Sequence, residues 1–137
     1  MSSSLSVLFL VIVFYGSSAV GAKLAELGVE IRYVPCERFV VKGDFVHVYY
    51  TGRLYETKEE FDSNVGGEPL GITVGAGQVI AGWEKGLIGT CEGEQRRLLI
   101  PSEMAYGSRG YSNLIPPNSD LEFDIELVRI DKRNDEL

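Results

Sequence analysis

The sequence is poor in the side chains on which metal and redox chemistry depend. Its 137 residues include two cysteines, Cys36 and Cys91, and one histidine, His47. These are too few for a structural zinc site, which takes four protein ligands. The C-x-x-C pair of redox proteins and the D-x-D-x-D-G loop that binds calcium are both absent. We therefore expect no metal site.

Positive charge is also scarce. The chain has 13 Lys and Arg side chains against 20 Asp and Glu, which gives a formal net charge of -7. An acidic surface repels phosphate backbones, so we expect no nucleic-acid partner. Beyond its first residues the chain has no linker, internal repeat or low-complexity tract. Its length and its 45% of hydrophobic residues fit one globular domain.

The first 22 residues carry no charged side chain. Their apolar block, Leu5 to Tyr15, is shorter than the roughly 20 residues that a membrane-spanning helix needs. Small residues follow it, a pattern typical of a secretory signal peptide that is cleaved near Gly21 and Ala22. The alternative is a signal anchor that stays attached. In either case we expect residues 1–22 to lie outside a folded domain formed by residues 23–133.

The last four residues, 134–137, read NDEL. This ending resembles the KDEL and HDEL signals that return soluble proteins to the endoplasmic reticulum, although Asn134 replaces the usual Lys or His. The alternative is an ordinary acidic tail, but the signal peptide at the other end favours the endoplasmic reticulum lumen. In that oxidising compartment we expect Cys36 and Cys91 to form a disulfide, the alternative being two buried free thiols.

Apolar and polar side chains mostly alternate along the domain, which is the period of β-strands. Strands are expected in these segments: 29–33, 38–41, 45–55, 69–74, 94–101 and 121–130. The last is the clearest, because Leu121, Phe123 and Ile125 alternate with charged residues. After Leu127 the alternation slips, which a β-bulge would explain.

Only one segment has a helical period. Ile80, Trp83 and Leu87 lie at positions i, i+3 and i+7 and form one apolar stripe. Gly82 and Gly86 fall inside this segment, and each costs about 1 kcal/mol relative to Ala, so the helix cannot form alone. We expect an α+β domain in which a curved antiparallel sheet of five to six strands wraps around this one short α-helix. The glycines would let the sheet approach the helix backbone, and the opposite face of the sheet would be charged and exposed.

Five aromatic side chains are candidates for lining a hollow at one end of the helix: Tyr50, Phe61, Trp83, Tyr106 and Phe123. Trp83, the only tryptophan in the chain, could form the floor. Aromatic residues also supply much of the core of any small domain, so the residues alone leave both interpretations open.

Five segments follow one another in an order that is highly specific: VYYTGRLYE, EFDSN, GQVIAGWEKGLIG, CEGEQRRLLIPSEMAYG and NLIPPNSDLEFDIELVRI. Together they closely resemble the FKBP-type peptidyl-prolyl cis-trans isomerases over nearly all of Gly28 to Ile130. The two terminal signals and the cysteine pair are similar to those of small endoplasmic reticulum members of that family. The resemblance implies an enzyme that accelerates X–Pro isomerisation during protein folding, with no cofactor. The alternative is a non-catalytic chaperone or scaffold module that binds proline-containing peptides through the same fold.

The resemblance also implies a pocket for a proline ring. The residues implied in catalysis are Tyr50, Asp62, Trp83, Tyr106 and Phe123. Those implied in substrate binding are Phe61, Leu70, Val79, Ile80, Tyr111, Leu114 and Ile115. In this pocket Trp83 would form the floor. The Ile80 N–H and the Tyr106 hydroxyl would donate hydrogen bonds to ligand carbonyls, and Asp62 would accept one.

Two departures from the family pattern bear on ligands. Leu70 lies where the family commonly has Phe, which should widen the pocket and weaken tight binding. The loop after Asp62, residues 64–69, is shorter and lacks the basic residue that some members place near this carboxylate. We expect proline-containing polypeptides as partners, macrolides as a second class of ligand, and a monomeric protein.

Overall fold

The computed structural model describes residues 23–32, 34–131 and 133. The expected signal peptide and the NDEL ending lie outside these residues. Within them the elements are β1 (Gly28–Arg32), β2 (Phe45–Leu54), β3 (Glu60–Ser63), β4 (Leu70–Thr73), α1 (Ala81–Gly86), β5 (Gln95–Ile100), the 3-10 helices η1 (Ser102–Met104) and η2 (Gly107–Arg109), and β6 (Leu121–Ile130). No helix in this part of the chain is long and apolar enough to cross a membrane.

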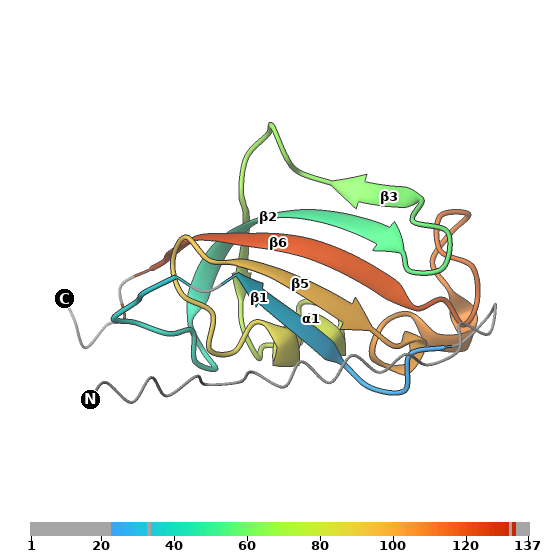
Figure 1. The fold of residues 1–137 in the computed structure, drawn as a ribbon, viewed down its shortest axis with the longest axis horizontal. Helices are drawn as coiled ribbons and strands as arrows, with labels where there is room; N and C mark the ends of the chain where they lie inside the picture. The colour runs from blue at the N-terminus through green and yellow to red at the C-terminus, as the bar shows by residue number, and fades with distance from the viewer. Residues whose placement is uncertain (1–22, 33, 132, 134–137) are drawn as a thin grey trace, which may run out of the picture.

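All six strands belong to one antiparallel sheet with the order β1-β5-β6-β2-β3. β4 joins it as a further partner of β2, so β3 and β4 pair with successive parts of one edge of that strand. Between the two pairings the Asn64 side chain takes the place of a strand. Its Oδ1 accepts from the Tyr50 N–H at 2.7 Å, and its Nδ2 donates to the Val48 carbonyl at 3.0 Å. This predicted α+β architecture, a six-stranded sheet with one short helix, is confirmed (Figure 1).

The bulge expected in β6 is present. Val48 pairs with Leu127, while its neighbour His47 pairs with Arg129, so that Val128 has no partner on β2. The extra residue shifts the alternation by one position. As a result Leu127 and Ile130 are both buried although their spacing is odd.

α1 lies across the inner face of the sheet, and its glycines are the points of closest approach (Figure 1). A Cβ added at Gly82 would lie 2.5 Å from Ile100 Cγ2, and one at Gly86 would lie 2.7 Å from both Leu98 methyl carbons. Arg96 of β5 fastens the far end of the helix, because its Nη1 donates to the Gly86 and Ile88 carbonyls at 2.9 Å.

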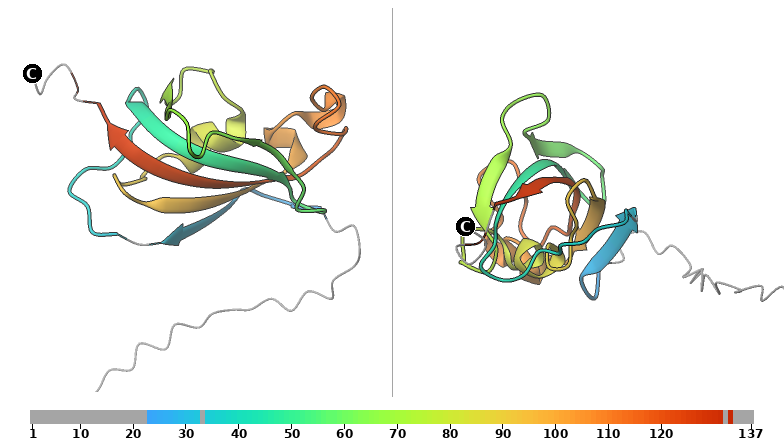
Figure 2. Two further views of the ribbon diagram at one scale, coloured as in Figure 1. Left: turned by 90° about the horizontal axis from the view of Figure 1, so that it is seen from above. Right: turned by 90° about the vertical axis from the view of Figure 1, so that its left-hand side faces the viewer.

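The core fills the space between this helix and the curved sheet, which bends around it when the molecule is viewed along its long axis (Figure 2). It is built from these buried side chains: Val40, Val46, Val48, Ile72, Val74, Trp83, Leu87, Leu98, Ile100, Ile115, Leu121, Phe123, Ile125, Leu127 and Ile130. The inward residues of β2, β5 and β6 supply most of it, as strand alternation requires.

The strand expected at residues 38–41 is wrong as the partner of β2. Instead, Val40 donates to the Thr90 carbonyl at 2.9 Å and accepts from the Gly89 N–H at 2.8 Å, so this segment follows the exit from α1. The Cys36–Cys91 disulfide, with a Cα–Cα distance of 5.7 Å, fastens the same two segments. The predicted disulfide is therefore confirmed. Its cross-link lies where the alternation of residues 38–41 gave no hint of a different partner.

Candidate active site

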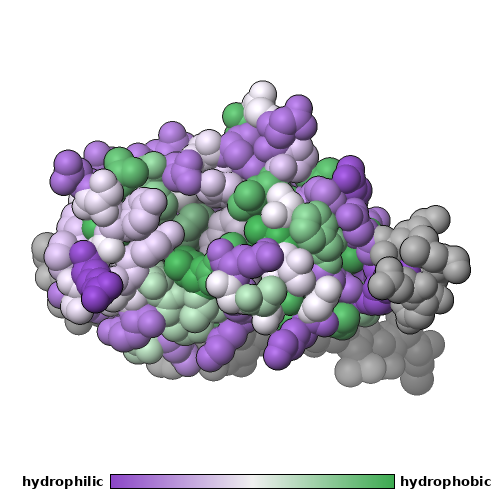
Figure 3. All heavy atoms as spheres, turned by 180° about the vertical axis from the view of Figure 1, so that it is seen from behind, coloured by the Kyte–Doolittle hydropathy of each residue, from purple (hydrophilic) through white to green (hydrophobic). Residues whose placement is uncertain are grey.

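A cavity of about 170 Å³ opens beside the N-terminal end of α1. It is lined by Tyr50, Phe61, Asp62, Leu70, Gln78, Val79, Ile80, Trp83, Tyr106 and Phe123. The cavity is smaller than the roughly 300–1,000 Å³ of pockets for drug-sized ligands, and it has room for one small ring. On the face of the molecule opposite to that of Figure 1, apolar side chains reach the surface among polar ones (Figure 3).

The cavity is built from aromatic rings that meet edge to face. The Trp83 ring lies 5.2 Å from that of Tyr50 and 5.3 Å from that of Phe123, and Phe61 lies 5.7 Å from Phe123. Trp83 is only 4% exposed, and its indole N–H has no hydrogen-bond partner among the described residues. Edge-to-face contacts fix ring orientation, so the cavity has rigid and mostly apolar walls.

Gly52 of β2 makes this arrangement of rings possible. A Cβ at this position would lie 2.7 Å from Phe61 Cζ and 2.7 Å from Phe123 Cε1. Any larger residue would therefore push both rings towards the cavity. The sequence reasoning missed this role, although a glycine inside the strand segment YYTG is a signal for close approach.

The polar groups of the site are few and are mostly hydrogen-bond donors. The Tyr50 hydroxyl donates to Asp62 Oδ2 at 2.7 Å. Burial, and then this bond to Asp62, raise the pKa of Tyr50 to about 12. Burial also raises the pKa of Tyr106, with smaller contributions from Tyr111 and Asp62. Both hydroxyls therefore stay protonated at neutral pH, and neither can act as a base.

Two donors are not engaged within the described residues. No hydrogen bond is recorded for the Tyr106 hydroxyl or for the backbone N–H of Ile80. Ile80 has extended dihedral angles, φ -59° and ψ 153°, at the residue just before α1, and its carbonyl accepts from Trp83 and Glu84. Both donors belong to residues that line the cavity, where they can meet the carbonyl groups of a bound peptide.

Three residues predicted around the pocket do not line this cavity. Ile115 is buried in the core, whereas Tyr111 and Leu114 are 56% and 52% exposed. They belong to a loop closed by two hydrogen bonds between Tyr111 and Ile115, and the Tyr111 ring lies 5.3 Å from that of Tyr106. The loop therefore borders the site through Tyr106. The other predicted residues are brought together, but their individual roles stay predictions.

Gln78 lines the cavity and was not predicted. Its Oε1 accepts from the Thr73 N–H at 2.9 Å, which ties the segment before α1 to the end of β4. Its position next to Val79 and Ile80 was the available signal, but nothing in its residue type distinguishes it from an exposed turn residue.

Comparison with known proteins decides the family. Residues 36–128 match the family described as FKBP-type peptidyl-prolyl cis-trans isomerase. The chain belongs to this family. It is 47% identical over 123 residues to FK506-binding protein 2 of Candida glabrata, with 89% of this chain and 90% of the relative covered. It is 43% identical over 120 residues to the peptidyl-prolyl cis-trans isomerase FKBP2 of Mus musculus, covering 87% and 85%.

Solved structures agree with this assignment. The crystal structure of AtFKBP13 superposes with a TM-score of 0.70 at 37% identity, covering 78% of this chain and 94% of that one. The chain is thus a peptidyl-prolyl cis-trans isomerase, and its family binds proline-containing peptides and macrolides.

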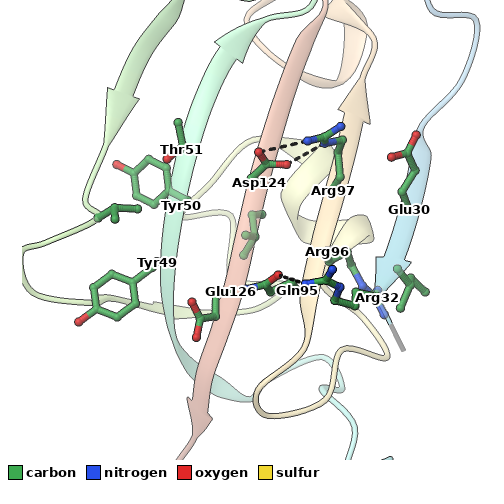
Figure 4. A pocket seen from close by; sticks show the side chains of 13 residues that line it. Glu30, Arg32, Tyr49, Tyr50, Thr51, Gln95, Arg96, Arg97, Asp124 and Glu126 are labelled. Carbon is green, nitrogen blue, oxygen red and sulfur yellow. Dashed lines mark hydrogen bonds and ion pairs between the residues drawn. The ribbon is translucent and has the colours of Figure 1, made fainter. Parts of the chain in front are cut away.

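This isomerase has a second and larger hollow, of about 550 Å³, on the outer face of its sheet (Figure 4). Its charged side chains engage one another. Arg97 Nε lies 2.7 Å from Asp124 Oδ1, and Arg32 Nη1 lies 3.5 Å from Gln95 Oε1. Such a surface is the charged outer face predicted from strand alternation, whereas binding sites are mostly apolar with a few polar groups. The aromatic cavity is therefore the candidate active site.

No group of three His, Cys, Asp or Glu side chains that could hold a metal occurs within residues 23–32, 34–131 and 133.

Proposed function

We propose that this isomerase accelerates the cis/trans interconversion of X–Pro bonds in newly made polypeptides of the endoplasmic reticulum lumen, and that the aromatic cavity holds the proline ring. The observation that supports this most strongly is the 170 Å³ cavity with Trp83 at its floor, beside two hydrogen-bond donors that have no recorded partner. Tyr50, Phe61 and Phe123 form its walls in this proposal.

The reaction makes and breaks no covalent bond, so the site needs no nucleophile. The barrier of about 18–20 kcal/mol arises because resonance holds the amide planar, and uncatalysed X–Pro exchange takes tens to hundreds of seconds. A site that favours the twisted amide over the planar one lowers that barrier. The planar amide is the more polar of the two, so transfer into the aromatic cavity disfavours it relative to the twisted form.

The polar groups then hold the two ends of the bond while it rotates. The Tyr106 hydroxyl and the Ile80 N–H donate to carbonyls on either side of the proline, and both groups lie at the edge of the cavity. Asp62 accepts a hydrogen bond from the substrate while it also keeps the Tyr50 hydroxyl in place at 2.7 Å. Fixed donors of this kind reduce the reorganisation that the transition state requires.

The location in the endoplasmic reticulum rests on the two ends of the chain, residues 1–22 and 134–137, read as a cleaved signal peptide and a retention signal. The Cys36–Cys91 disulfide supports it, because disulfides persist in oxidising compartments. We infer that the mature protein works as a monomer. Macrolides would bind the same cavity more weakly than they bind relatives with Phe at position 70, because Leu70 is 38% exposed and leaves that wall open.

An isomerisation assay on a proline tetrapeptide tests the proposed site, using the protein without residues 1–22. Trp83→Leu and Tyr106→Phe should lower kcat/KM, by about tenfold or more for Trp83, while Tyr49→Phe should leave it unchanged. Tyr49 is the matched control because it lies on the outer face, where its hydroxyl bonds to the Gly67 carbonyl at 3.3 Å (Figure 4). Equal activity in all four proteins would place the reaction elsewhere.

The location is tested in cells with an epitope inserted after the cleavage site. Removal of residues 134–137 should send the protein into the medium, whereas the complete chain should stay inside and co-fractionate with the endoplasmic reticulum. Secretion of the complete chain would contradict the retention signal.

A further inference from the structure

We propose that this isomerase selects X–Pro bonds in which X is Lys or Arg, through the carboxylate of Asp62. The inference rests on the proposed function of the aromatic cavity and names the class of substrate that the cavity takes.

Asp62 is a charge without a counter-charge. It is the only charged side chain among the described residues that line the cavity. Its recorded hydrogen bond is with a neutral group, the Tyr50 hydroxyl. The ion pairs recorded in the described chain engage Asp44, Glu94, Glu122, Asp124 and Asp131, and none of them includes Asp62.

The chain around Asp62 supplies no cation. From residue 59 to residue 84 there is no Lys or Arg, and this stretch contains most of the cavity lining, from Phe61 to Trp83. The cations that precede it in sequence are engaged elsewhere. Arg53 lies 2.8 Å from Asp124, and Lys58 lies 3.1 Å from Glu122. The counter-charge for Asp62 must therefore come from the substrate.

The position of Asp62 indicates which substrate residue provides it. The cavity has room for one small ring, so the side chain next to a bound proline must lie at its rim, where Asp62 is exposed to solvent. Lys and Arg have apolar stems that can cross this rim and charged ends that stay in water. The Tyr106 and Tyr111 rings, 5.3 Å apart, border the site and present further faces that attract a cation. An acidic X residue would be repelled by the same carboxylate.

The test measures kcat/KM for peptides Ala-X-Pro-Phe in which X is Lys, norleucine or Glu. Norleucine matches the stem of Lys without its charge. At low salt the Lys peptide should be isomerised about 2- to 5-fold faster than the norleucine peptide, as expected for one solvent-exposed ion pair, and the Glu peptide more slowly than either. The preference should largely disappear in 1 M NaCl, where the screening length falls to about 3 Å.

Two variants assign the preference to Asp62. Asp62→Asn keeps an acceptor for Tyr50 and should bring the Lys-to-norleucine ratio to about one, whatever its effect on absolute activity. Glu126→Gln removes the same charge from the outer face of the sheet and should leave the ratio unchanged (Figure 4). A ratio of one or less in the unmodified protein, or an unchanged ratio in Asp62→Asn, would overturn the proposal.

The same experiment separates this proposal from that of the active site. Affinities of the three peptides are measured alongside turnover. If Trp83→Leu keeps full activity, the proposed site fails. If only the charge preference is missing from both turnover and affinity, the selection by Asp62 fails while the proposed site stands.

Discussion

Replacing Gly82 by Ala tests whether α1 depends on close approach to the sheet. On helix propensity alone this change would stabilise the protein by about 1 kcal/mol. In the structure, however, the new Cβ would lie 2.5, 2.7 and 2.8 Å from three side-chain carbons of Ile100. Ile100 is fully buried on β5, a strand held between β1 and β6, so it cannot move aside.

Overpacking of a buried contact costs about 1–3 kcal/mol. This exceeds the gain in propensity, so Gly82→Ala should lower the free energy of unfolding by up to about 2 kcal/mol. It should also reduce isomerase activity, because Trp83 is the next residue of the helix and would move with it. Ala81, which is exposed on the same helix, provides the control: Ala81→Gly should cost no more than about 1 kcal/mol and leave activity unchanged.

A double-mutant cycle isolates the contact. Ile100→Ala alone should cost about 2–5 kcal/mol because it opens a cavity in the core. In the double variant the Cβ at position 82 enters the space that Ile100 has left, so the total cost should be smaller than the sum of the single costs by about 1–3 kcal/mol. Urea denaturation followed by circular dichroism gives all four values. A Gly82→Ala protein that is more stable than the parent, or strictly additive costs, would refute this account of the helix.

Three further predictions follow from the polar contacts and the disulfide. Stability should fall as the pH rises from about 10, the ordinary pKa of a tyrosine, towards the pKa of Tyr50 of about 12, since the folded state holds this proton more tightly; Tyr50→Phe should remove that part of the slope in alkaline denaturation. Burial raises the pKa of Asp44, but hydrogen bonds from Arg133 and from a backbone N–H outweigh it and leave that pKa lowered, so the stability it provides is present above pH of about 4 and is lost in acid as the pH falls through the lowered pKa. Arg133→Ala should therefore shift acid unfolding to higher pH, and an unchanged midpoint would count against the pair. Cys36→Ser should lower the free energy of unfolding by about 2–4 kcal/mol, measured by the same denaturation in non-reducing buffer, and no loss would mean that the bridged loop is held by its other contacts.

The elements that were predicted correctly are those with a strong local pattern. β6 shows why, because its alternation specifies both its inner face and, through the slip after Leu127, its bulge. The two glycines of α1 likewise indicate a helix that needs a sheet. By contrast, residues 38–41 alternate like a strand, but their partner is the exit of α1, a long-range choice that local alternation does not encode.

The site shows the same division. The aromatic residues of the cavity were identified through a family resemblance, since aromatic composition alone did not distinguish a site from a core. Gly52, Asn64 and Gln78 were missed because each acts through contacts that arise only once strands are paired. Asn64 replaces a missing strand along β2, and Gly52 makes room for two rings that lie far from it in sequence or across the sheet.

Trp83 itself provides the most direct test of the central claim, that the proline ring binds against its indole. It is the only tryptophan of the chain, so the fluorescence of the protein reports on the cavity floor alone. Titration with a proline tetrapeptide should change this emission with a midpoint equal to the affinity obtained from inhibition of the isomerase assay, and the same peptide with Ala in place of Pro should not. Turnover of the proline peptide at saturating concentration with unchanged Trp83 emission would contradict the claim.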